Sequence, residues 1–405
     1  MGSSMYMQSK GITLLHTADL HLGFLYGGLK EKAAERQQDN QETFLYIISL
    51  CRERNVDILL IAGDLFDTPV PDRELLKTVR KAFAVISETL VVISPGNHDY
   101  YEPGGIYDDI ESWSDNVFIF HGEMDCFEFN IRGETVRIYG AAFTGQYQRE
   151  PLMKQRRLTG DGVISIGLFH GELGTGGWDS KYNRITPEQI EENRFSYTAL
   201  GHIHRAEGIS YAGQAAYAYC GSPEGHGFDE TGGKGVWLGS ITGEECNLEF
   251  FRTCRRQYIV EKICIEGFES AKQLADYLLL SFRNRYGGEY KDYLYQLKFY
   301  GSNRQDIDLE RVGFCLRDLY YIEIKDETET VLKEYSRDSG EKFNRIRDEK
   351  RTTGKDSLEV YFEERMRRLI TAEEAREDRD ENRIKRYRRA LQLGLEAVLN
   401  DRRKG

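Results

Sequence analysis

The chain has 405 residues, of which 40% are apolar and 30% charged, and its formal net charge is −12. This length predicts about two or three domains with a large buried core. No apolar run approaches the roughly 20 residues that cross a bilayer, and the chain does not open with a signal peptide. The composition therefore excludes an integral membrane protein and predicts a cytoplasmic one.

Charge is distributed unevenly along the chain. Residues 251–405 hold 34 basic and 31 acidic side chains, whereas residues 1–250 hold 21 basic and 36 acidic ones. An acidic N-terminal part argues against tight, independent binding to nucleic acid. Two bound dications would offset about four of these negative charges where a phosphate approaches.

The seven cysteines are scattered and form no CxxC pair. This usage predicts reduced packing residues, without disulfides or a zinc-cysteine site.

The first half of the chain alternates strands and helices. Residues 1–10 form a polar leader, which we expect to be disordered. The apolar patterns predict strands over 11–16 and 58–62 and helices over 31–54 and 72–89, the second helix beginning at Asp72. Such alternation is typical of α/β layers.

Shorter strands follow from residue 100 onward. The runs VFIFHG and VRIYGAAF predict hairpins in a mixed sheet. Buried strands are expected over 163–169 and 197–200, with a short helix opening at Thr186-Pro187 between them. Residues 217–222 and 235–239 are expected to close the second sheet.

The C-terminal third divides into two parts. Residues 255–330 show a βαβαβ pattern that predicts a small second domain. Residues 331–405 are highly charged and predict helices with a single apolar stripe. Two interpretations stay open for these helices: they dock on a partner, or they pack against this chain's own second domain.

The strand from Ile58 ends in the run ILLIAGDLFD, which brings Asp64 and then Asp67 to a strand end. Four other strand-like runs end in residues of the same chemical kind. They carry Asp19, His21, Asn97, His98, His170, His202 and His204. A lone histidine after a strand is more often structural than a ligand. Five of eight histidines at such ends, with carboxylates or amides nearby, indicate a site.

Carboxylates, an amide and imidazoles are the ligands of a two-metal centre, whose ions lie roughly 3.5 to 4 Å apart. Asp64, on the central strand, is the expected bridging ligand. One ion would take Asp19, His21 and His204, and the other Asn97, His170 and His202. His202 and His204 alternate with Ile203, so their rings face different ions.

Five motifs in order resemble the calcineurin-like metallophosphoesterase superfamily: D-x-H (Asp19, His21), G-D-x-x-D (Gly63, Asp64, Asp67), G-N-H-D (Gly96 to Asp99), His170, and G-H-x-H (Gly201, His202, His204). Each is weak alone, and together they are specific. The residues that surround these motifs resemble those of the SbcD nucleases over residues 11 to about 250.

The resemblance implies a four-layer αββα sandwich with two Mn²⁺ ions, Mg²⁺ or other divalent ions being alternatives. It implies a domain over residues 11–254 that hydrolyses DNA in double-strand break repair, as a double-strand exonuclease and single-strand endonuclease. His98 would be the general acid and Asp67 would orient it. Archaeal relatives carry His at the position of Asp67.

The resemblance also implies partners. These are DNA, a coiled-coil ATPase of the SbcC type and a second copy of the chain. The expected location is the cytoplasm, in association with the nucleoid. The chain has no phosphate-binding loop of its own, since Gly232-Gly233-Lys234-Gly235 lacks the spacing. By position, residues 331–405 would bind the ATPase and residues 255–330 would cap the site and bind DNA.

Candidate DNA contacts are Lys154, Arg156, Arg157 and Tyr182. The more ordinary interpretation of these residues is a solvated loop and a packed aromatic ring. Two other functions stay open. In the first, the chain is a phosphodiesterase or phosphatase for nucleotides and small esters. In the second, it is an adaptor whose metal site is structural.

Overall fold

The computed structural model describes residues 11–156, 162–174, 180–303 and 306–329. Contacts divide the chain into two compact units, residues 1–329 and residues 330–405. The predicted leader, Arg157 and the predicted C-terminal helices lie outside the described residues.

The first sheet has six strands in the order β14-β13-β1-β2-β3-β4. They are β1 (Ile12–Thr17), β2 (Ile58–Ile61), β3 (Leu90–Ile93), β4 (Val117–Ile119), β13 (Gly235–Ile241) and β14 (Cys246–Arg252). Strands β1 to β4 are parallel to one another. They are mostly apolar because both faces of the sheet are covered.

Two helices cover the outer face of this sheet. Helix α1 (Ala33–Glu53) and helix α2 (Arg73–Val85) share one apolar cluster with the strands, in which Phe44 and Phe83 pack edge to face. The predicted cap of α2 is confirmed, because the Asp72 carboxylate accepts the amides of Glu74 and Leu75. The segment before α1 forms the short 3₁₀ helix η1 (Gly27–Lys32).

The second sheet has the order β11-β12-β10-β7-β6-β5. Its strands are β5 (Asp125–Ile131), β6 (Glu134–Gly140), β7 (Val163–His170), β10 (Tyr197–Gly201), β11 (Ser210–Ala212) and β12 (Ala215–Tyr219). Helix α3 (Pro187–Asn193) lies against its outer face and begins with a capping box formed by Thr186 and Gln189. A small ladder joins β8 (Glu172–Leu173) to β9 (Arg184–Ile185).

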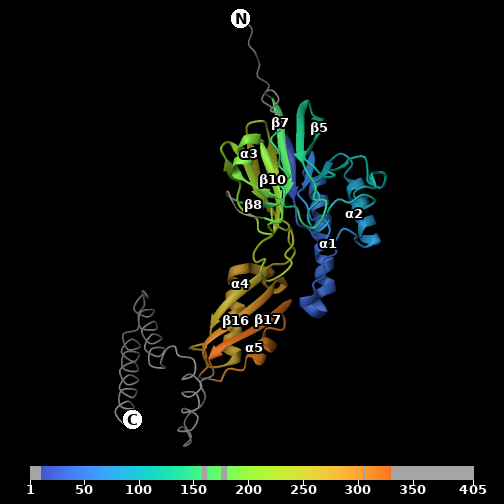
Figure 1. The fold of residues 1–405 in the computed structure, drawn as a ribbon. Coiled ribbons are helices and arrows are strands. Elements are labelled where there is room, and N and C mark those ends of the chain that lie inside the picture. Colours follow the sequence, from blue (N-terminus) through green and yellow to red (C-terminus); the bar gives the residue numbers. More distant parts are fainter. Residues whose placement is uncertain (1–10, 157–161, 175–179, 304–305, 330–405) are drawn as a thin grey trace, which may run out of the picture. The chain divides into compact units, whose positions relative to one another are not determined.

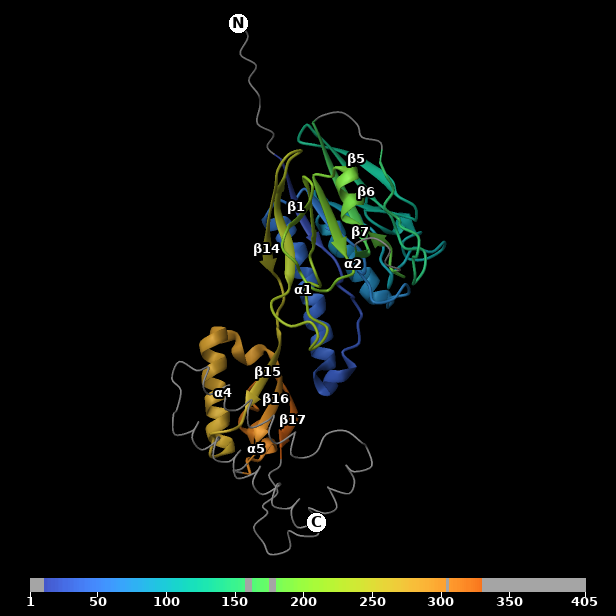
Figure 2. The ribbon, with the colours of Figure 1, turned by 60° about the vertical axis from the view of Figure 1, so that its left-hand side comes forward.

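The two sheets pack face to face. One buried cluster joins Leu14 and Leu60 of the first sheet to Ile166 and Tyr197 of the second. With α1 and α2 on one side and α3 on the other, the predicted four-layer αββα sandwich is confirmed (Figures 1 and 2).

Two strand predictions were wrong. The run VFIFHG is not in a hairpin, because β4 is the edge strand of the first sheet and runs parallel to β3. Residues 235–239 belong to β13, which pairs antiparallel with β1 in the first sheet and not in the second. Apolar alternation fixes the faces of a strand and not its partner, so the sequence pattern could not separate these pairings.

The next region has the predicted βαβαβ pattern and contains a third, smaller sheet. Its elements are β15 (Tyr258–Cys264), α4 (Ala271–Tyr286), β16 (Leu294–Ser302), α5 (Leu309–Cys315) and β17 (Tyr321–Glu329). All three strands are parallel, and a cluster that includes Leu274, Leu278, Tyr295 and Phe299 is the core of this region.

Buried charges fasten α1 to the segments that precede the third sheet. Arg36 is fully buried and donates to Asp39 (2.8 Å) and to Glu224 (2.7 Å). Glu224 also accepts the backbone amide of Arg255, and Asp39 accepts the guanidinium of Arg256. Removing one member of such a network leaves an unpaired buried charge, so these five residues hold their segments together.

All seven cysteines are free thiols, as predicted. Among the described residues, no helix is long and apolar enough to span a membrane.

Candidate metal centre

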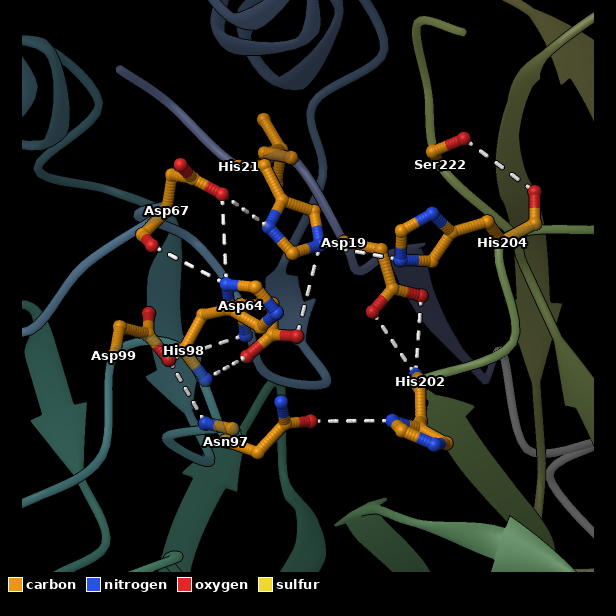
Figure 3. Close-up of polar contacts among 12 residues, drawn as sticks. Asp19, His21, Asp64, Asp67, Asn97, His98, Asp99, His202, His204 and Ser222 are labelled. Carbon is orange, nitrogen blue, oxygen red and sulfur yellow. Dashed lines mark hydrogen bonds and ion pairs between the residues drawn. The ribbon is translucent and has the colours of Figure 1, made fainter. Parts of the chain in front are cut away.

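The predicted ligands meet at one edge of the two sheets, beyond the carboxyl ends of parallel strands (Figure 3). Each strand contributes ligands at its last residue or in the loop that follows it. Asp19 and His21 follow β1, Asp64 and Asp67 follow β2, Asn97 and His98 follow β3, His170 ends β7, and His202 and His204 follow β10. The structure therefore brings together all nine residues that the sequence selected for this edge.

The backbone at these strand ends is strained. Asp19, Asp64 and His202 have positive φ angles of 51°, 51° and 101°, a region that side chains other than glycine rarely adopt. Gly96 permits a close approach, because a Cβ there would collide with the Asp64 carboxylate. The backbone is thus bent to aim polar side chains at one point.

One group of ligand atoms surrounds His21. Its Nε2 lies 3.1 Å from His204 Nε2 and 3.6 Å from Asp64 Oδ2. Ligand atoms of Asp19, His21 and His204 all lie within 4.8 Å of one another. These are the residues predicted for the first ion.

A second group surrounds Asn97. Its Oδ1 lies 2.9 Å from His170 Nε2 and 3.1 Å from His202 Nδ1. Asp64 Oδ2 lies 3.4 Å from His170 Nε2, so this oxygen lies close to a histidine of each group. That position suits a carboxylate shared by two ions.

The residues present fit divalent cations. Asp19 and Asp64 are buried side by side, and buried carboxylates are unfavourable unless cations compensate them. The carboxylate, amide and imidazole donors are those of hard and borderline ions. Burial and the neighbouring His170 lower the pKa of His202 to about 3, so this imidazole is neutral, as a ligand must be.

His98 lies beside this cluster and differs from the other histidines. Its side chain is 43% exposed, and its Nδ1 lies 3.4 Å from Asp67 Oδ1 and 3.2 Å from the Asp67 carbonyl oxygen. Its backbone amide donates to Asp64 Oδ1 (2.9 Å). Hydrogen bonding to Asp67 raises the pKa of His98 to about 9, and cations bound at Asp64 would oppose that shift. An exposed imidazole that a carboxylate orients in this way can act as a proton donor.

Asp67 contacts a second histidine. The same Oδ1 lies 3.2 Å from His21 Nδ1, so one carboxylate orients a candidate ligand and the candidate acid. The family resemblance implied the contact between Asp67 and His98, and it did not imply the contact between Asp67 and His21.

Sequence reasoning also missed Asp99. Its buried carboxylate accepts the amides of Asp64, Phe66 and Gly96 and the hydroxyl of Tyr107. It therefore ties the loop after β2 to the loop after β3. The aspartate that closes the G-N-H-D motif was a sufficient signal to select it.

Glu172 and Glu230 were missed as well. Glu172 Oε1 lies 3.3 Å from His202 Nε2, and Glu230 Oε1 lies 2.7 Å from His204 Nδ1. His226 joins them, with its Nδ1 3.2 Å from Glu230 Oε1. Glu172 follows His170 by two residues, which offered a signal, whereas Glu230 lies in a long loop without periodicity.

The predicted DNA contacts are placed differently from one another. Lys154 is exposed. The Arg156 guanidinium donates to the carbonyl oxygens of Asn193 (2.7 Å) and Arg194 (3.1 Å), which favours packing over a phosphate contact. The Tyr182 ring lies 4.8 Å from the His202 ring, at the edge of the candidate metal centre.

Residues 12–206 match the family model of the calcineurin-like phosphoesterases. The chain therefore contains a domain of this family, and that domain carries all the predicted metal ligands. Its resemblance to SbcD-type nucleases is borne out by the relatives that follow.

Three curated relatives are similar to this chain. An uncharacterized metallophosphoesterase of Bacillus subtilis, YhaO, is 28% identical over 272 residues, covering 65% of each chain. The DNA double-strand break repair protein Mre11 of Methanocaldococcus jannaschii is 26% identical, covering 58% of this chain and 64% of its own. The SbcD subunit of the nuclease SbcCD of Escherichia coli K12 is 27% identical, covering 58% and 66%. The chain thus spans slightly less than two thirds of the length of these relatives.

Proposed function

We propose that this chain is a metal-dependent phosphodiesterase that cleaves DNA, the nuclease subunit of an SbcCD-like complex in double-strand break repair. One observation carries the proposal. The exposed His98 imidazole is held by Asp67 beside a cluster of buried carboxylate, amide and imidazole ligands. A structural metal site has no need of an exposed, oriented proton donor, so this arrangement favours catalysis over the adaptor function.

The chain's own residues would divide the reaction among them. Two bound divalent ions, Mn²⁺ in this proposal, would polarise the phosphodiester and acidify the attacking water. Asp19, His21 and His204 would hold one ion, Asn97, His170 and His202 the other, and Asp64 both. His98 would protonate the leaving oxygen of the sugar, with Asp67 fixing the ring.

DNA is proposed as the substrate because two of the three relatives are named for DNA repair or nuclease activity. Lys154 would contact the phosphate backbone and Tyr182 would stack on a base. The βαβαβ region would cap the site, and residues 331–405 would bind a coiled-coil ATPase. A homodimer and a place at the nucleoid complete the proposal.

The test measures Mn²⁺-dependent cleavage of a linear duplex, a single-stranded circle and bis-p-nitrophenyl phosphate by the wild type and by His98→Ala. We expect the wild type to cleave all three. Because p-nitrophenolate leaves without a proton, the variant should lose about 10²- to 10⁴-fold on DNA and much less on the small ester.

Equal losses on all substrates would contradict the role of His98 as general acid. Turnover of the small ester alone, even after addition of the ATPase partner, would favour a phosphodiesterase for nucleotides and small esters. Mn²⁺ binding without any turnover would favour the adaptor.

A further inference from the structure

Each candidate ligand histidine has an oxygen atom at the ring nitrogen that faces away from the other ligands. For His170 this oxygen is the Ala62 carbonyl, 2.9 Å from Nδ1, and for His21 it is Asp67. For His202 and His204 it is a glutamate carboxylate that belongs to no motif in the sequence. These two glutamates, Glu172 and Glu230, are the subject of the inference.

The Glu230 carboxylate has several polar contacts. Besides His204, its carboxylate accepts the hydroxyl of Ser222 (2.6 Å) and contacts Lys234 Nζ (3.3 Å) and His226 Nδ1 (3.2 Å). The Lys234 ammonium also donates to the His204 carbonyl oxygen (2.6 Å), which fixes the same loop from its other side. A carboxylate with this many partners keeps its charge although it is largely buried, and it cannot rotate away from the imidazole.

Glu172 is more open and has fewer partners. Its second oxygen accepts the Ser180 hydroxyl (2.8 Å), and the Tyr182 amide in turn donates to the Ser180 oxygen (2.8 Å). The ladder between β8 and β9 places the Glu172 backbone. The carboxylate is therefore directed at His202 by a short β structure.

The two contacts select opposite ring nitrogens. Glu230 accepts from Nδ1 of His204, which leaves Nε2 to face His21 at 3.1 Å. Glu172 accepts from Nε2 of His202, which leaves Nδ1 to face Asn97 at 3.1 Å. Since a neutral imidazole carries one proton, each carboxylate fixes which nitrogen keeps a lone pair for a metal ion.

We propose that Glu230 and Glu172 are positioning residues, each fixing the tautomer of one histidine and tuning the affinity for one ion. Glu230 acts on the ion bound by His204, and Glu172 acts on the ion bound by His202. The inference rests on the two-ion centre of the proposed function and assigns a separate control of affinity to each ion.

The test is a titration of the full chain with Mn²⁺, in which electron paramagnetic resonance measures the free ion. We expect two bound ions in the wild type. Glu230→Ala should weaken one of them by about 10- to 100-fold, Glu172→Ala should weaken one by a similar factor, and the double variant should weaken both. Glu207→Ala, which removes an exposed acid from the loop after His204, is the matched control and should titrate like the wild type.

A second readout separates positioning from mere support of the loop. With the diamagnetic ion Mg²⁺ bound, long-range ¹H–¹⁵N spectra should report a proton on Nδ1 of His204 and on Nε2 of His202. Glu230→Gln keeps an oxygen acceptor and should retain the His204 tautomer with a smaller loss of affinity than Glu230→Ala.

Opposite tautomers, or wild-type titrations for both alanine variants, would overturn the inference while leaving the proposed function intact. A wild-type chain that binds no Mn²⁺ would instead remove the metal centre of the proposed function.

Discussion

Two regions of the molecule are built on parallel strands: the site edge of the two large sheets, and the third, smaller sheet. They differ in the burial of polar groups and in backbone angles. At the edge, Asp19, His21, Asp64 and His202 all have positive φ, and two carboxylates are buried side by side. The described part of the third sheet has one such non-glycine residue, Asp306, and an apolar core. The first region gives up stability to hold polar side chains close together, whereas the core of the second is packed with apolar side chains that stabilise it.

Asp64→Ala should have the largest effect, because it removes the carboxylate that lies between the two ligand groups. We expect metal-dependent hydrolysis to fall by at least about 10³-fold, as an electrostatic group acting in the transition state is lost. At a hundred times Kd, Mn²⁺ should stabilise the wild type by about 2.7 kcal/mol, whereas in the variant it should no longer raise the melting temperature.

The control for this prediction is Asp72→Ala, which removes the N-cap of α2. It should cost about 1 kcal/mol of stability and leave the Mn²⁺ effect unchanged. If Asp64→Ala retained the Mn²⁺-dependent rise in melting temperature, the assignment of this residue as a shared ligand would fail.

Gly96→Ala tests whether the edge depends on close backbone approach. The new methyl group would collide with the Asp64 carboxylate and backbone, so Asp64 must move. A misplacement of about 1 Å costs about 10²-fold in rate, and we expect a loss of kcat/KM of that order. Gly288→Ala, where nothing lies within 4 Å of the new atom and φ is not positive, is the control for the added methyl. Full activity of Gly96→Ala would show that the edge has more room than the structure gives it.

Leu274→Ala tests the third sheet. Leu274 is fully buried in the core of this region, and the cavity should cost about 2 to 5 kcal/mol in the free energy of unfolding. Chemical denaturation measures this loss. The Mn²⁺ titration should not change, and a parallel loss of metal affinity would mean that the two regions are not as separate as their cores suggest.

Lys154→Ala should have the smallest effect. If the exposed ammonium meets one phosphate of bound DNA, its removal should weaken binding slightly and reduce the salt dependence by about one unit in slope. Arg156→Ala, which removes hydrogen bonds within the chain, should instead lower stability and leave the slope unchanged. The opposite pattern would exchange the roles of these two residues.

The sequence predicted which side chains meet at this edge, because their chemistry and their position are both local. Asp64 and His170 each follow a buried apolar run, and the ends of parallel strands meet at one edge whatever the rest of the chain does. The same rule placed Asn97 and His204.

What the sequence could not predict depends on contacts between distant segments. Glu230 reaches His204 through an irregular loop, and no spacing encodes that contact. Arg36 lies on α1, and its burial depends on Glu224, which is 188 positions away in the sequence. The position of β13 in the first sheet was not predicted either, because its partner β1 lies far away in the sequence.

The position of Asp67 has a further consequence for how substitutions combine. Because one oxygen contacts both His21 and His98, a candidate metal ligand and the candidate proton donor share one carboxylate. We therefore expect the effects of His21 and His98 substitutions on activity to be non-additive. A double-mutant cycle should show that, once either ring is gone, losing the other costs much less, so that metal loading and proton donation fail together.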